Sequence, residues 1–266
     1  MEAVPCASFE DALDLVKSGE ANFAMIPIEN SIAGRVADIH VLLPESGLNI
    51  VGEHFLRIRF HLLGIRGSTI EQAKEVHSHL HALGQCRKLI RSRGLTPVVA
   101  GDTAGSAREV AEWNDPSKVS LAPPMAADLY GLDVLAEDVE DDPTNTTRFV
   151  VVSRDGRHLG REAMPGPVMT SFVFRVRNVP SALYKALGGF ATNGVNMTRL
   201  ESYMVGNQFA ATTFMADVEG HPADTPLRLA LDELEFFTDE VRILGVYPAA
   251  PSRTTFRSSP AIAPEP

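Results

Sequence analysis

The stretch Asp141-Asp142-Pro143-Thr144-Asn145-Thr146-Thr147-Arg148-Phe149 leads directly into the apolar run Val150-Val151-Val152. Two acids and a proline predict a turn, and the run from Phe149 to Val152 predicts a buried strand. Hydroxyls, an amide and a guanidinium therefore gather at the start of a strand, where an arginine fork and neutral donors suit a carboxylate ligand. The alternative is an Asx-type turn that leads into a strand, with Arg148 in solvent.

The composition is that of a globular protein and argues against several functional classes. Of the 266 residues, 44% are apolar and 22% are charged, and the net charge is −10. Neither a basic run nor an apolar stretch of about 18 residues occurs, so we expect neither nucleic acid nor a membrane as a partner. Because Cys6 and Cys86 form no disulfide framework and no signal-peptide pattern is present, we expect a reducing cytoplasmic location.

The first 153 residues alternate between short apolar runs and amphipathic segments, which predicts a mostly parallel sheet with helices on both faces. Ser8 is a suitable N-cap for the first helix, and Gly19 ends it. The predicted strands are 23–28, 96–100, 119–122 and 149–152, with an extended segment over 48–64. The further predicted helices are 36–43, 81–93, 107–113 and 124–130.

Three loops at the ends of predicted strands carry polar side chains, namely 29–31, 101–106 and 144–148. Ligands gather at such strand ends in α/β folds, so the loops predict a cleft for a small polar ligand. The N–H groups of the 101–106 turn suit an anion. The alternative for 29–31 is a helix cap with a turn. We do not predict a metal site at His77, His79 and His81, because they alternate as on one strand face without a nearby acidic or thiol partner.

A second pattern follows a linker at 154–167, which has a high share of Gly, Pro and charged residues. The order β-α-β-β-α-β predicts a ferredoxin-like unit over 168–248, with a hairpin turn at Gly206-Asn207. Such a unit has an exposed edge and one bare sheet face, which favours pairing with a second copy. The Pro-, Ser- and Ala-rich residues 249–266 predict a disordered tail. The predicted strands are 169–177, 195–204, 208–219 and 241–247, and the helices are 180–192 and 226–237.

Four segments, in order, make the chain similar to prephenate dehydratase with an attached ACT domain. They are Ala24-Met25-Ile26-Pro27-Ile28-Glu29-Asn30-Ser31, Ser78-His79 with Ala82-Leu83 and Gln85-Cys86, Asp102-Thr103-Ala104, and Asn145-Thr146-Thr147-Arg148-Phe149. The resemblance implies a two-lobed, periplasmic-binding-protein-like (type II) catalytic domain over 1–153, followed by a ferredoxin-like βαββαβ ACT domain. The family starts with a strand and a Gly-rich turn that we expect to be missing here.

The second domain departs from the family pattern at three positions. Pro180-Ser181-Ala182-Leu183 resembles the effector-binding Gly-Ala-Leu segment, with serine in place of glycine. Leu200-Glu201-Ser202-Tyr203 resembles the Glu-Ser-Arg-Pro segment, with Tyr203 and Met204 in place of Arg and Pro. The resemblance implies L-phenylalanine as the effector. The effector-binding residues it implies are Ser181, Ala182, Leu183, Asn193, Asn196, Glu201 and Ser202.

The resemblance also implies the reaction, the decarboxylating dehydration of prephenate to phenylpyruvate. Aromatisation drives it, so no cofactor is expected. Thr147 is the candidate for assisting the departing hydroxyl, Glu29 is the competing acid, and Arg148 is expected to hold a carboxylate. The expected substrate-binding residues are Asn30, Ser78, Gln85, Thr103 and Phe149. We expect a homodimer or homotetramer. The alternative functions are those of an arogenate dehydratase or of a non-catalytic phenylalanine sensor.

Overall fold

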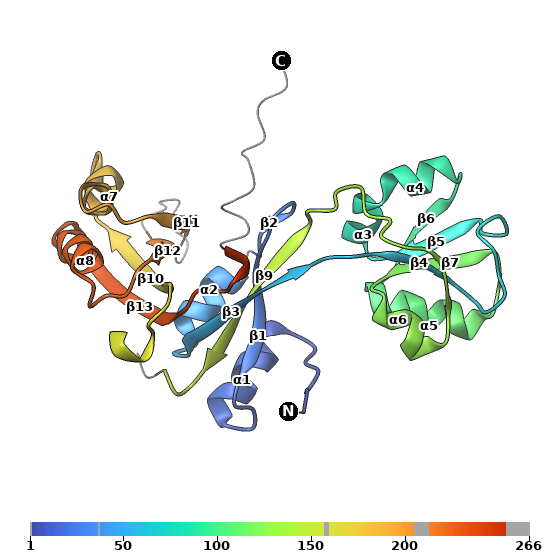
Figure 1. Cartoon of the computed structure of the whole chain (residues 1–266), viewed down its shortest axis with the longest axis horizontal. Helices are drawn as coiled ribbons and strands as arrows, with labels where there is room; N and C mark the ends of the chain where they lie inside the picture. The colour runs from blue at the N-terminus through green and yellow to red at the C-terminus, as the bar shows by residue number, and fades with distance from the viewer. Residues whose placement is uncertain (1, 37, 157–159, 205–212, 254–266) are drawn as a thin grey trace, which may run out of the picture. The chain divides into compact units, whose positions relative to one another are not determined.

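The computed structural model describes residues 2–36, 38–156, 160–204 and 213–253, and the chain divides into two compact units (Figure 1). Unit 1 combines residues 1–56 with 147–266, and unit 2 is residues 57–146. The chain therefore passes between the units twice, after Leu56 and before Thr147. The segment predicted as a first domain contributes to both units, as expected for a two-lobed arrangement.

Unit 2 contains a mixed five-stranded sheet in the order β6-β5-β7-β4-β8. β5 pairs in parallel with β6 and β7, whereas β4 pairs antiparallel with β7 and β8. Leu62 and Leu63 point to opposite faces, one packed against α3 and α4 and the other against α5 and α6. The elements are β4 (His61–Gly64), β5 (Glu75–Ser78), β6 (Thr96–Val99), β7 (Lys118–Ala122), β8 (Asp133–Ala136), α3 (Leu80–Gln85), α4 (Arg87–Ser92), α5 (Thr103–Trp113) and α6 (Met125–Tyr130).

The first sheet of unit 1 has four strands in the order β2-β1-β9-β3. β1 pairs antiparallel with both β2 and β9, so the prediction of a mostly parallel sheet is wrong here, although helices on both faces are confirmed for unit 2. Alternation along β1 and β9 buries Ile26, Ile28, Val150 and Val152 on one face. The elements are β1 (Ala24–Asn30), β2 (Gly34–Arg35), β3 (Asn49–Arg57), β9 (Thr146–Ser153), α1 (Phe9–Ser18) and α2 (Ile39–Glu45).

The start and end signals of α1 work as the sequence predicts. The Ser8 hydroxyl accepts from the Asp11 N–H while the Asp11 carboxylate accepts from the Ser8 N–H, which is a capping box. Gly19 follows the helix with φ of 90°, a left-handed conformation that glycine adopts readily. Leu13 and Val16 then face the core of unit 1.

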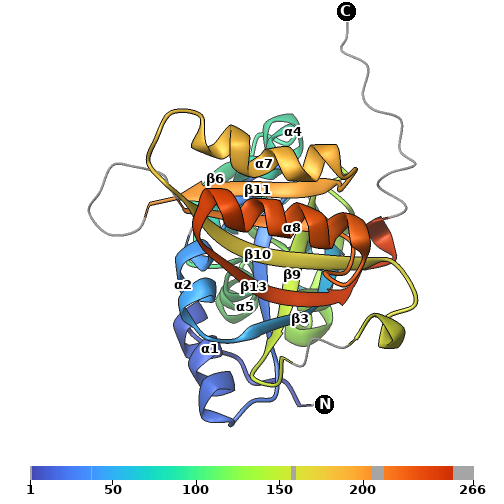
Figure 2. The same cartoon turned by 90° about the vertical axis from the view of Figure 1, so that its left-hand side faces the viewer.

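The ferredoxin-like arrangement over the C-terminal part of unit 1 is confirmed. Its sheet has the order β11-β12-β10-β13, and the two helices cover one face, as Figure 2 shows for α7 and α8. Phe172 of β10, Phe190 of α7 and Leu234 of α8 lie in the core between the sheet and these helices. The elements are β10 (Val168–Val176), α7 (Ala182–Thr192), β11 (Met197–Tyr203), β12 (Thr213–Glu219), α8 (Thr225–Phe237) and β13 (Thr238–Pro248), preceded in the linker by the short 3-10 helix η1 (Arg161–Ala163).

The predicted bare face of this second sheet is wrong. Met169, Val173, Met215, Leu244 and Tyr247 from that face pack into the same core cluster as the apolar residues of β1 and β9. The ferredoxin-like part and the first sheet of unit 1 therefore share one hydrophobic core. A second copy is not needed to cover this face, so one of the two grounds for predicting self-association is lost.

Two predicted boundaries also change. The helix predicted over 81–93 is two helices, because Cys86 between them has a non-helical φ of −125° and ψ of 31°. The predicted tail is wrong for residues 249–253, where Ala249 donates to the Pro167 carbonyl and Arg253 pairs with Glu53. The turn Gly206-Asn207 and residues 254–266 lie outside the described residues. Among the helices that the structure describes, none is long and apolar enough to cross a membrane.

Candidate active site

Asn30 and Thr147 meet across the antiparallel pair of β1 and β9. The register places them directly opposite each other, and the Asn30 amide nitrogen donates to the Thr147 hydroxyl oxygen at 2.9 Å. The amide oxygen of Asn30 accepts from the N–H groups of Ile32 and Ala33 at 3.0 and 2.8 Å, which fixes its orientation. Because Thr147 accepts in this contact, its own proton is oriented to donate elsewhere.

Arg148 lies on the opposite face of β9 from Thr147 and Phe149, since side chains alternate along a strand. It is only 2% exposed, and four of its N–H groups donate to protein oxygens. The acceptors are Glu53 at 2.8 Å, Glu29 at 2.8 Å, Asp217 at 2.6 Å and the Tyr247 hydroxyl at 3.0 Å.

The predicted role of Arg148 is therefore corrected on physical grounds. Protein carboxylates use the donors of the Arg148 guanidinium, and this side chain lies on the strand face opposite Thr147. Arg148 therefore does not offer its donors to a substrate carboxylate that Thr147 also contacts. The alternative in which Arg148 is solvated is equally wrong. The Asx-type turn is present, however, because Asp142 accepts from the N–H and the hydroxyl of Thr144 at 2.8 and 2.6 Å.

Burial and charge oppose each other around Arg148. Burial works most strongly against its charge, but Asp217, Glu53 and Glu29 outweigh it and raise the pKa of Arg148 well above its ordinary value. Burial likewise favours the neutral form of Asp217, yet Arg148 and Arg199 hold the pKa of Asp217 well below its usual range. The cluster therefore consists of charged side chains that are kept charged by one another.

Glu29, the neighbour of Asn30 in β1, contacts this cluster. Its Oε1 accepts from Arg148, and its Oε2 lies 3.8 Å from the Arg199 Nε. Both oxygens of this carboxylate therefore face arginines of the cluster, so Glu29 is one of the residues that hold Arg148. Phe149 is half-buried on the same face of β9 as Thr147 and pairs with Pro27 of β1.

Two of the predicted substrate-binding residues in unit 2 are held by protein groups. Ser78 is fully buried, and its hydroxyl donates to the Leu121 carbonyl at 2.6 Å. The Gln85 side-chain oxygen accepts from the Asn145 amide at 2.7 Å, which ties the end of α3 to the loop before β9. The structure therefore brings Asn30 and Thr147 together in unit 1, and Gln85 and Asn145 together in unit 2.

The predicted anion site at Thr103 is already partly satisfied from within the chain. Thr103 is the first residue of α5, and Asp102 caps the helix by accepting from the Gly105 N–H at 2.5 Å. The carboxylate of Asp102, which stands where the family has serine, therefore takes one donor that an anion would use. It also places a negative charge beside the remaining donors.

The three histidines do not share one strand face as predicted. His77 belongs to β5. Its Nε2 lies 3.3 Å from the Glu75 carboxylate, and its ring packs edge-on against Trp113. His79 caps α3, and its ring nitrogen accepts from the His81 N–H at 3.3 Å. Within the described ranges, no grouping of three His, Cys, Asp or Glu residues is arranged to hold a metal.

The predicted effector residues at α7 mark the ends of that helix. Ser181 precedes α7 in a left-handed conformation with φ of 64°, and Ala182, the first residue of α7, is buried. At the other end, the Asn193 amide donates to Glu233 at 3.0 Å. Leu183 packs against the same core as Ala182.

The predicted effector residues near β11 contact the first sheet of unit 1. Arg35 of β2 donates to the Ser202 carbonyl at 2.9 Å and lies 3.8 Å from the Glu201 carboxylate. Asn196, just before β11, accepts through its carbonyl from the Glu219 N–H at 3.0 Å. Glu201 and Ser202 are thus tied to the strand that pairs with Glu29 and Asn30.

Sequence reasoning missed the partners of Arg148. Glu53 lies in the predicted extended segment 48–64, Asp217 and Tyr247 lie in predicted strands, and Arg253 lies in the predicted tail. Arg253 forms a two-point ion pair with Glu53 at 2.6 and 2.8 Å. A single acid inside a buried strand, as at Asp217, was the available signal, because buried charges require partners.

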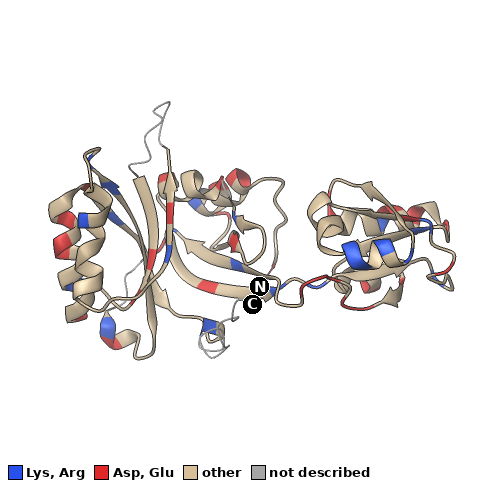
Figure 3. Ribbon diagram, turned by 90° about the horizontal axis from the view of Figure 1, so that it is seen from above, with Lys and Arg blue, Asp and Glu red and all other residues tan. Residues whose placement is uncertain are grey.

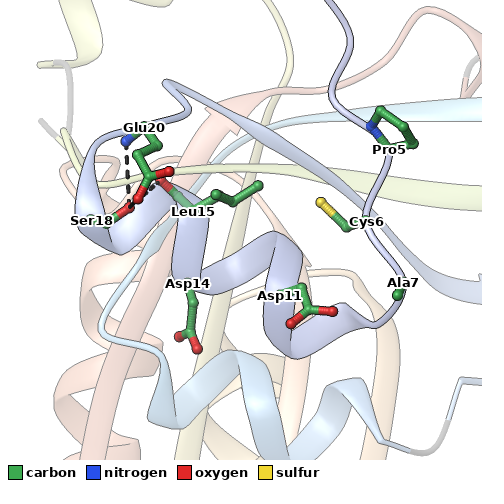
Figure 4. A pocket seen from close by; sticks show the side chains of 8 residues that line it. All are labelled: Pro5, Cys6, Ala7, Asp11, Asp14, Leu15, Ser18 and Glu20. Carbon is green, nitrogen blue, oxygen red and sulfur yellow. Dashed lines mark hydrogen bonds between the residues drawn. The ribbon is translucent and has the colours of Figure 1, made fainter.

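Two further surface features lie apart from the predicted site residues. A hollow of about 420 Å³ beside α1 is lined by Cys6, Asp11, Asp14 and Leu15, among others (Figure 4). Acidic and basic segments are interspersed over the elements of both units (Figure 3).

Cys86 is buried, and burial raises the pKa of its thiol to about 12, so it is not a nucleophile at neutral pH.

Comparison with known proteins assigns the chain to a family. The family model described as "Prephenate dehydratase" matches residues 1–157. A protein from Komagataeibacter europaeus named "Bifunctional N-acyl-homoserine lactone acylase/prephenate dehydratase" is 54% identical over 94% of this chain and 88% of its own length. "Arogenate dehydratase/prephenate dehydratase 2, chloroplastic" from Arabidopsis thaliana is 36% identical over 93% of this chain and 66% of its own length.

A solved structure agrees with these relatives. The prephenate dehydratase of Arthrobacter aurescens in complex with L-Phe is 33% identical and superimposes with a TM-score of 0.81, covering 96% of this chain and 87% of that one. The similarity therefore extends through the ferredoxin-like part as well as the residues that the family model matches. On these grounds, the chain belongs to the prephenate dehydratase family of carbon–oxygen lyases.

Proposed function

We propose that this protein converts prephenate to phenylpyruvate in L-phenylalanine biosynthesis and that L-phenylalanine regulates it. The observation that carries the proposal is the hydrogen bond from Asn30 to Thr147, which orients a hydroxyl of the Thr-Arg-Phe triplet. We assign residues 1–153 to the catalytic domain, 154–167 to a linker and 168–248 to an ACT regulatory domain. Family membership supports this assignment.

The reaction requires one proton and no cofactor. The bond from the ring to its carboxylate breaks and releases carbon dioxide, and the electron pair completes the aromatic ring. The bond from the ring to its hydroxyl breaks at the same time, and the oxygen leaves as water after it gains a proton. The protein must therefore stabilise negative charge as it develops on the departing oxygen.

Thr147 is the proposed donor to the departing oxygen. A threonine hydroxyl is a weak acid, so its contribution is a positioned hydrogen bond that strengthens as charge develops. Asn30 keeps the threonine oxygen as an acceptor, which directs the threonine proton toward the substrate. A proton is also needed to convert the departing oxygen to water. It comes from a group or a solvent molecule that the Thr147 hydroxyl connects to this oxygen by hydrogen bonds.

The remaining predicted residues keep proposed roles of orientation. Asn30, Phe149, Gln85 and Thr103 remain proposed substrate-binding residues. Ser78 would support the site through β5, because its buried hydroxyl is held by the Leu121 carbonyl. Arg148 is assigned a supporting role behind β9, because its donors are bound to Glu29, Glu53 and Asp217.

L-phenylalanine is the proposed effector of the ferredoxin-like domain. The related Arthrobacter aurescens structure contains L-Phe, and Glu201 and Ser202 lie next to Arg35 of the first sheet. Binding near these residues would shift the enzyme between states through its differential affinity for them. We further propose a cytoplasmic homodimer or homotetramer, with the exposed edge of the ferredoxin-like sheet as the ground for self-association.

An absorbance assay for phenylpyruvate tests this proposal. The full chain is incubated with prephenate and, in parallel, with arogenate, and the products are identified by mass spectrometry. Phenylpyruvate from prephenate supports the proposal. Phenylalanine formed from arogenate alone would make the protein an arogenate dehydratase, which some plant relatives are named for. Binding of phenylalanine without turnover of either compound would indicate a sensor.

A second candidate activity is the hydrolysis of N-acyl-homoserine lactones. The observation that favours it is the 54% identity with a bifunctional acylase/prephenate dehydratase over 94% of this chain. Cys86 does not supply the nucleophile, because its buried thiol stays protonated at neutral pH. Release of free fatty acid and homoserine lactone from an added N-acyl-homoserine lactone, followed by mass spectrometry, decides whether this chain has that activity.

A further inference from the structure

Four side chains form a closed hydrogen-bonded ring behind β9. Arg148 donates to Asp217 at 2.6 Å and to the Tyr247 hydroxyl at 3.0 Å. The Ser171 hydroxyl lies 2.5 Å from the Asp217 carboxylate and 2.7 Å from the Tyr247 hydroxyl. Each of the three residues that surround Arg148 in this ring belongs to the ferredoxin-like part of unit 1.

The ring is built from three adjacent strands. Asp217 comes from β12, Ser171 from β10 and Tyr247 from β13, which are neighbours in the sheet order β12-β10-β13. Ser171, Asp217 and Tyr247 are all fully buried. Three neighbouring strands thus present three polar groups, next to the apolar residues Met169, Val173 and Leu244, to one guanidinium from another sheet.

The charges around this ring balance. Arg148, Arg199 and Arg253 face the carboxylates of Glu29, Glu53 and Asp217, with the individual contacts at 2.6 to 3.8 Å. Within such a cluster a misplaced guanidinium would leave buried carboxylates without their partner, which is strongly unfavourable. The backbone of β9 at Arg148 is therefore held at a defined place relative to the ferredoxin-like sheet.

We propose that Asp217, Ser171 and Tyr247 are positioning residues for the reaction, which set the place of Thr147 by holding Arg148. Thr147 is the residue directly before Arg148, and it is also where the chain enters unit 1 from unit 2. Holding Arg148 from behind therefore fixes the strand at the point where Thr147 must meet Asn30. The ferredoxin-like domain thereby contributes to turnover itself, besides any effector that it binds.

This inference rests on the proposed function, since it requires that Thr147 assist the reaction. A rival explanation is that the ring only stabilises the fold. The two explanations differ in one measurable respect. If the ring positions Thr147, disrupting it lowers turnover through Thr147. If the ring only stabilises the fold, disrupting it lowers the melting temperature and leaves turnover by the folded protein unchanged. Small displacements of a reacting group are enough to lower a rate strongly.

The test uses conservative variants, because Asp217→Asn would remove one carboxylate partner from two buried arginines, Arg148 and Arg199, and could prevent folding. Ser171→Ala and Tyr247→Phe each delete one hydroxyl of the ring. Thr170→Val is the matched control for Ser171→Ala, since the Thr170 hydroxyl is buried in the same strand but donates to the Gly220 carbonyl. Tyr184→Phe, at an exposed tyrosine, is the control for Tyr247→Phe.

For each variant, kcat and KM for prephenate and the melting temperature are measured on the full chain. We expect Ser171→Ala and Tyr247→Phe to lower kcat about tenfold, as a displaced reacting group does, with KM changed less than about twofold. The two controls should leave kcat unchanged. In a Thr147→Ala background the effect of Ser171→Ala on kcat should vanish, because the ring then has no hydroxyl to position.

The outcomes separate the inference from the proposed function. Unchanged kcat in Ser171→Ala and Tyr247→Phe, with wild-type turnover present, overturns the positioning role alone. An equal loss of kcat with and without Thr147 also overturns it, because the ring would then act elsewhere. Failure of the wild-type chain to convert prephenate overturns the proposed function and the inference together.

Discussion

Asn30 faces Thr147 with its amide nitrogen because its amide oxygen is held by the N–H groups of Ile32 and Ala33. Asn30→Asp separates these two tasks. The carboxylate can still accept from the two N–H groups, so the loop after β1 keeps its turn. It cannot donate to Thr147 and instead attracts the threonine proton away from the substrate.

We therefore expect Asn30→Asp to fold with an unchanged melting temperature and to lower kcat about tenfold or more through loss of the oriented hydroxyl. Steady-state kinetics with prephenate and a thermal melt measure both. Full activity in this folded variant would show that the donor from Asn30 does not matter.

Arg253→Ala tests whether the residues after β13 stabilise the fold. The Glu53 side chain is fully buried, and Arg253 contributes two of its ion-pair contacts. Removing this partner should lower the free energy of unfolding by about 2 kcal/mol, less than for a wholly buried pair because Arg148 remains. Arg93→Ala is the control, since its pair with Glu71 is exposed and should contribute about 0 to 1 kcal/mol. Denaturant titration measures both.

The same variant should show a pH signature. Burial favours a raised pKa for Glu53, but the hydrogen bonds from Arg253 and the charge of Arg148 outweigh it and lower the pKa. A lowered pKa in the folded state stabilises the protein above the ordinary carboxyl pKa of about 4, and this stabilisation is lost as the pH falls. Wild type should thus lose stability below about pH 5 more steeply than Arg253→Ala. Equal slopes would contradict the role assigned to this pair.

Ser181→Gly should stabilise the protein. Ser181 has φ of 64°, and its side chain makes no capping hydrogen bond to α7. A left-handed conformation costs a residue with a Cβ about 1 to 2 kcal/mol, and the extra freedom of glycine in the unfolded chain offsets part of this. We expect a gain of about 0.5 to 1 kcal/mol in the free energy of unfolding. Ser181→Ala, which keeps the Cβ, should change it little, and a gain of the same size there would refute the explanation.

Arg35→Ala tests the contact between β2 and the proposed effector residues. Arg35 is half exposed, so the fold should tolerate its loss. Its guanidinium joins Ser202 and Glu201 to the strand opposite Glu29 and Asn30. We expect unchanged turnover without effector, and a response to phenylalanine weakened about fivefold or more, within the usual range of coupling between sites. An unaltered phenylalanine response would place the coupling elsewhere.

The sequence predicts the strands and the polar loops of the site well, because both depend on local patterns. The apolar runs of β1 and β9 are recognisable by themselves, and the Asx turn at Asp142 is a short-range hydrogen-bond pattern. The pairing of Asn30 with Thr147 is not local, since the two residues are separated by 117 positions and only the strand register brings them together. The sequence motifs that contain Asn30 and Thr147, rather than the hydrophobic periodicity, predict that both residues belong to one site.

The role of Arg148 could not be predicted in this way. Its three carboxylate partners lie 119, 95 and 69 positions away, on β1, on β3 and in the ferredoxin-like domain. A buried acid such as Asp217 signals that a partner exists, but the partner depends on which sheet faces pack together. The sequence leaves that face of the ferredoxin-like sheet bare, whereas Met215 and Leu244 bury it against the first sheet of unit 1.

The central claim is that the Thr147 hydroxyl, held by Asn30, assists the departure of the ring hydroxyl from prephenate. The most direct measurement is kcat for the wild-type chain, Thr147→Ser and Thr147→Ala under one set of conditions. Serine keeps the hydroxyl and should retain turnover within about tenfold, whereas alanine should lose about a hundredfold or more, as for removal of one donor to a developing negative charge. Equal turnover of prephenate by the wild-type chain and Thr147→Ala would contradict the account.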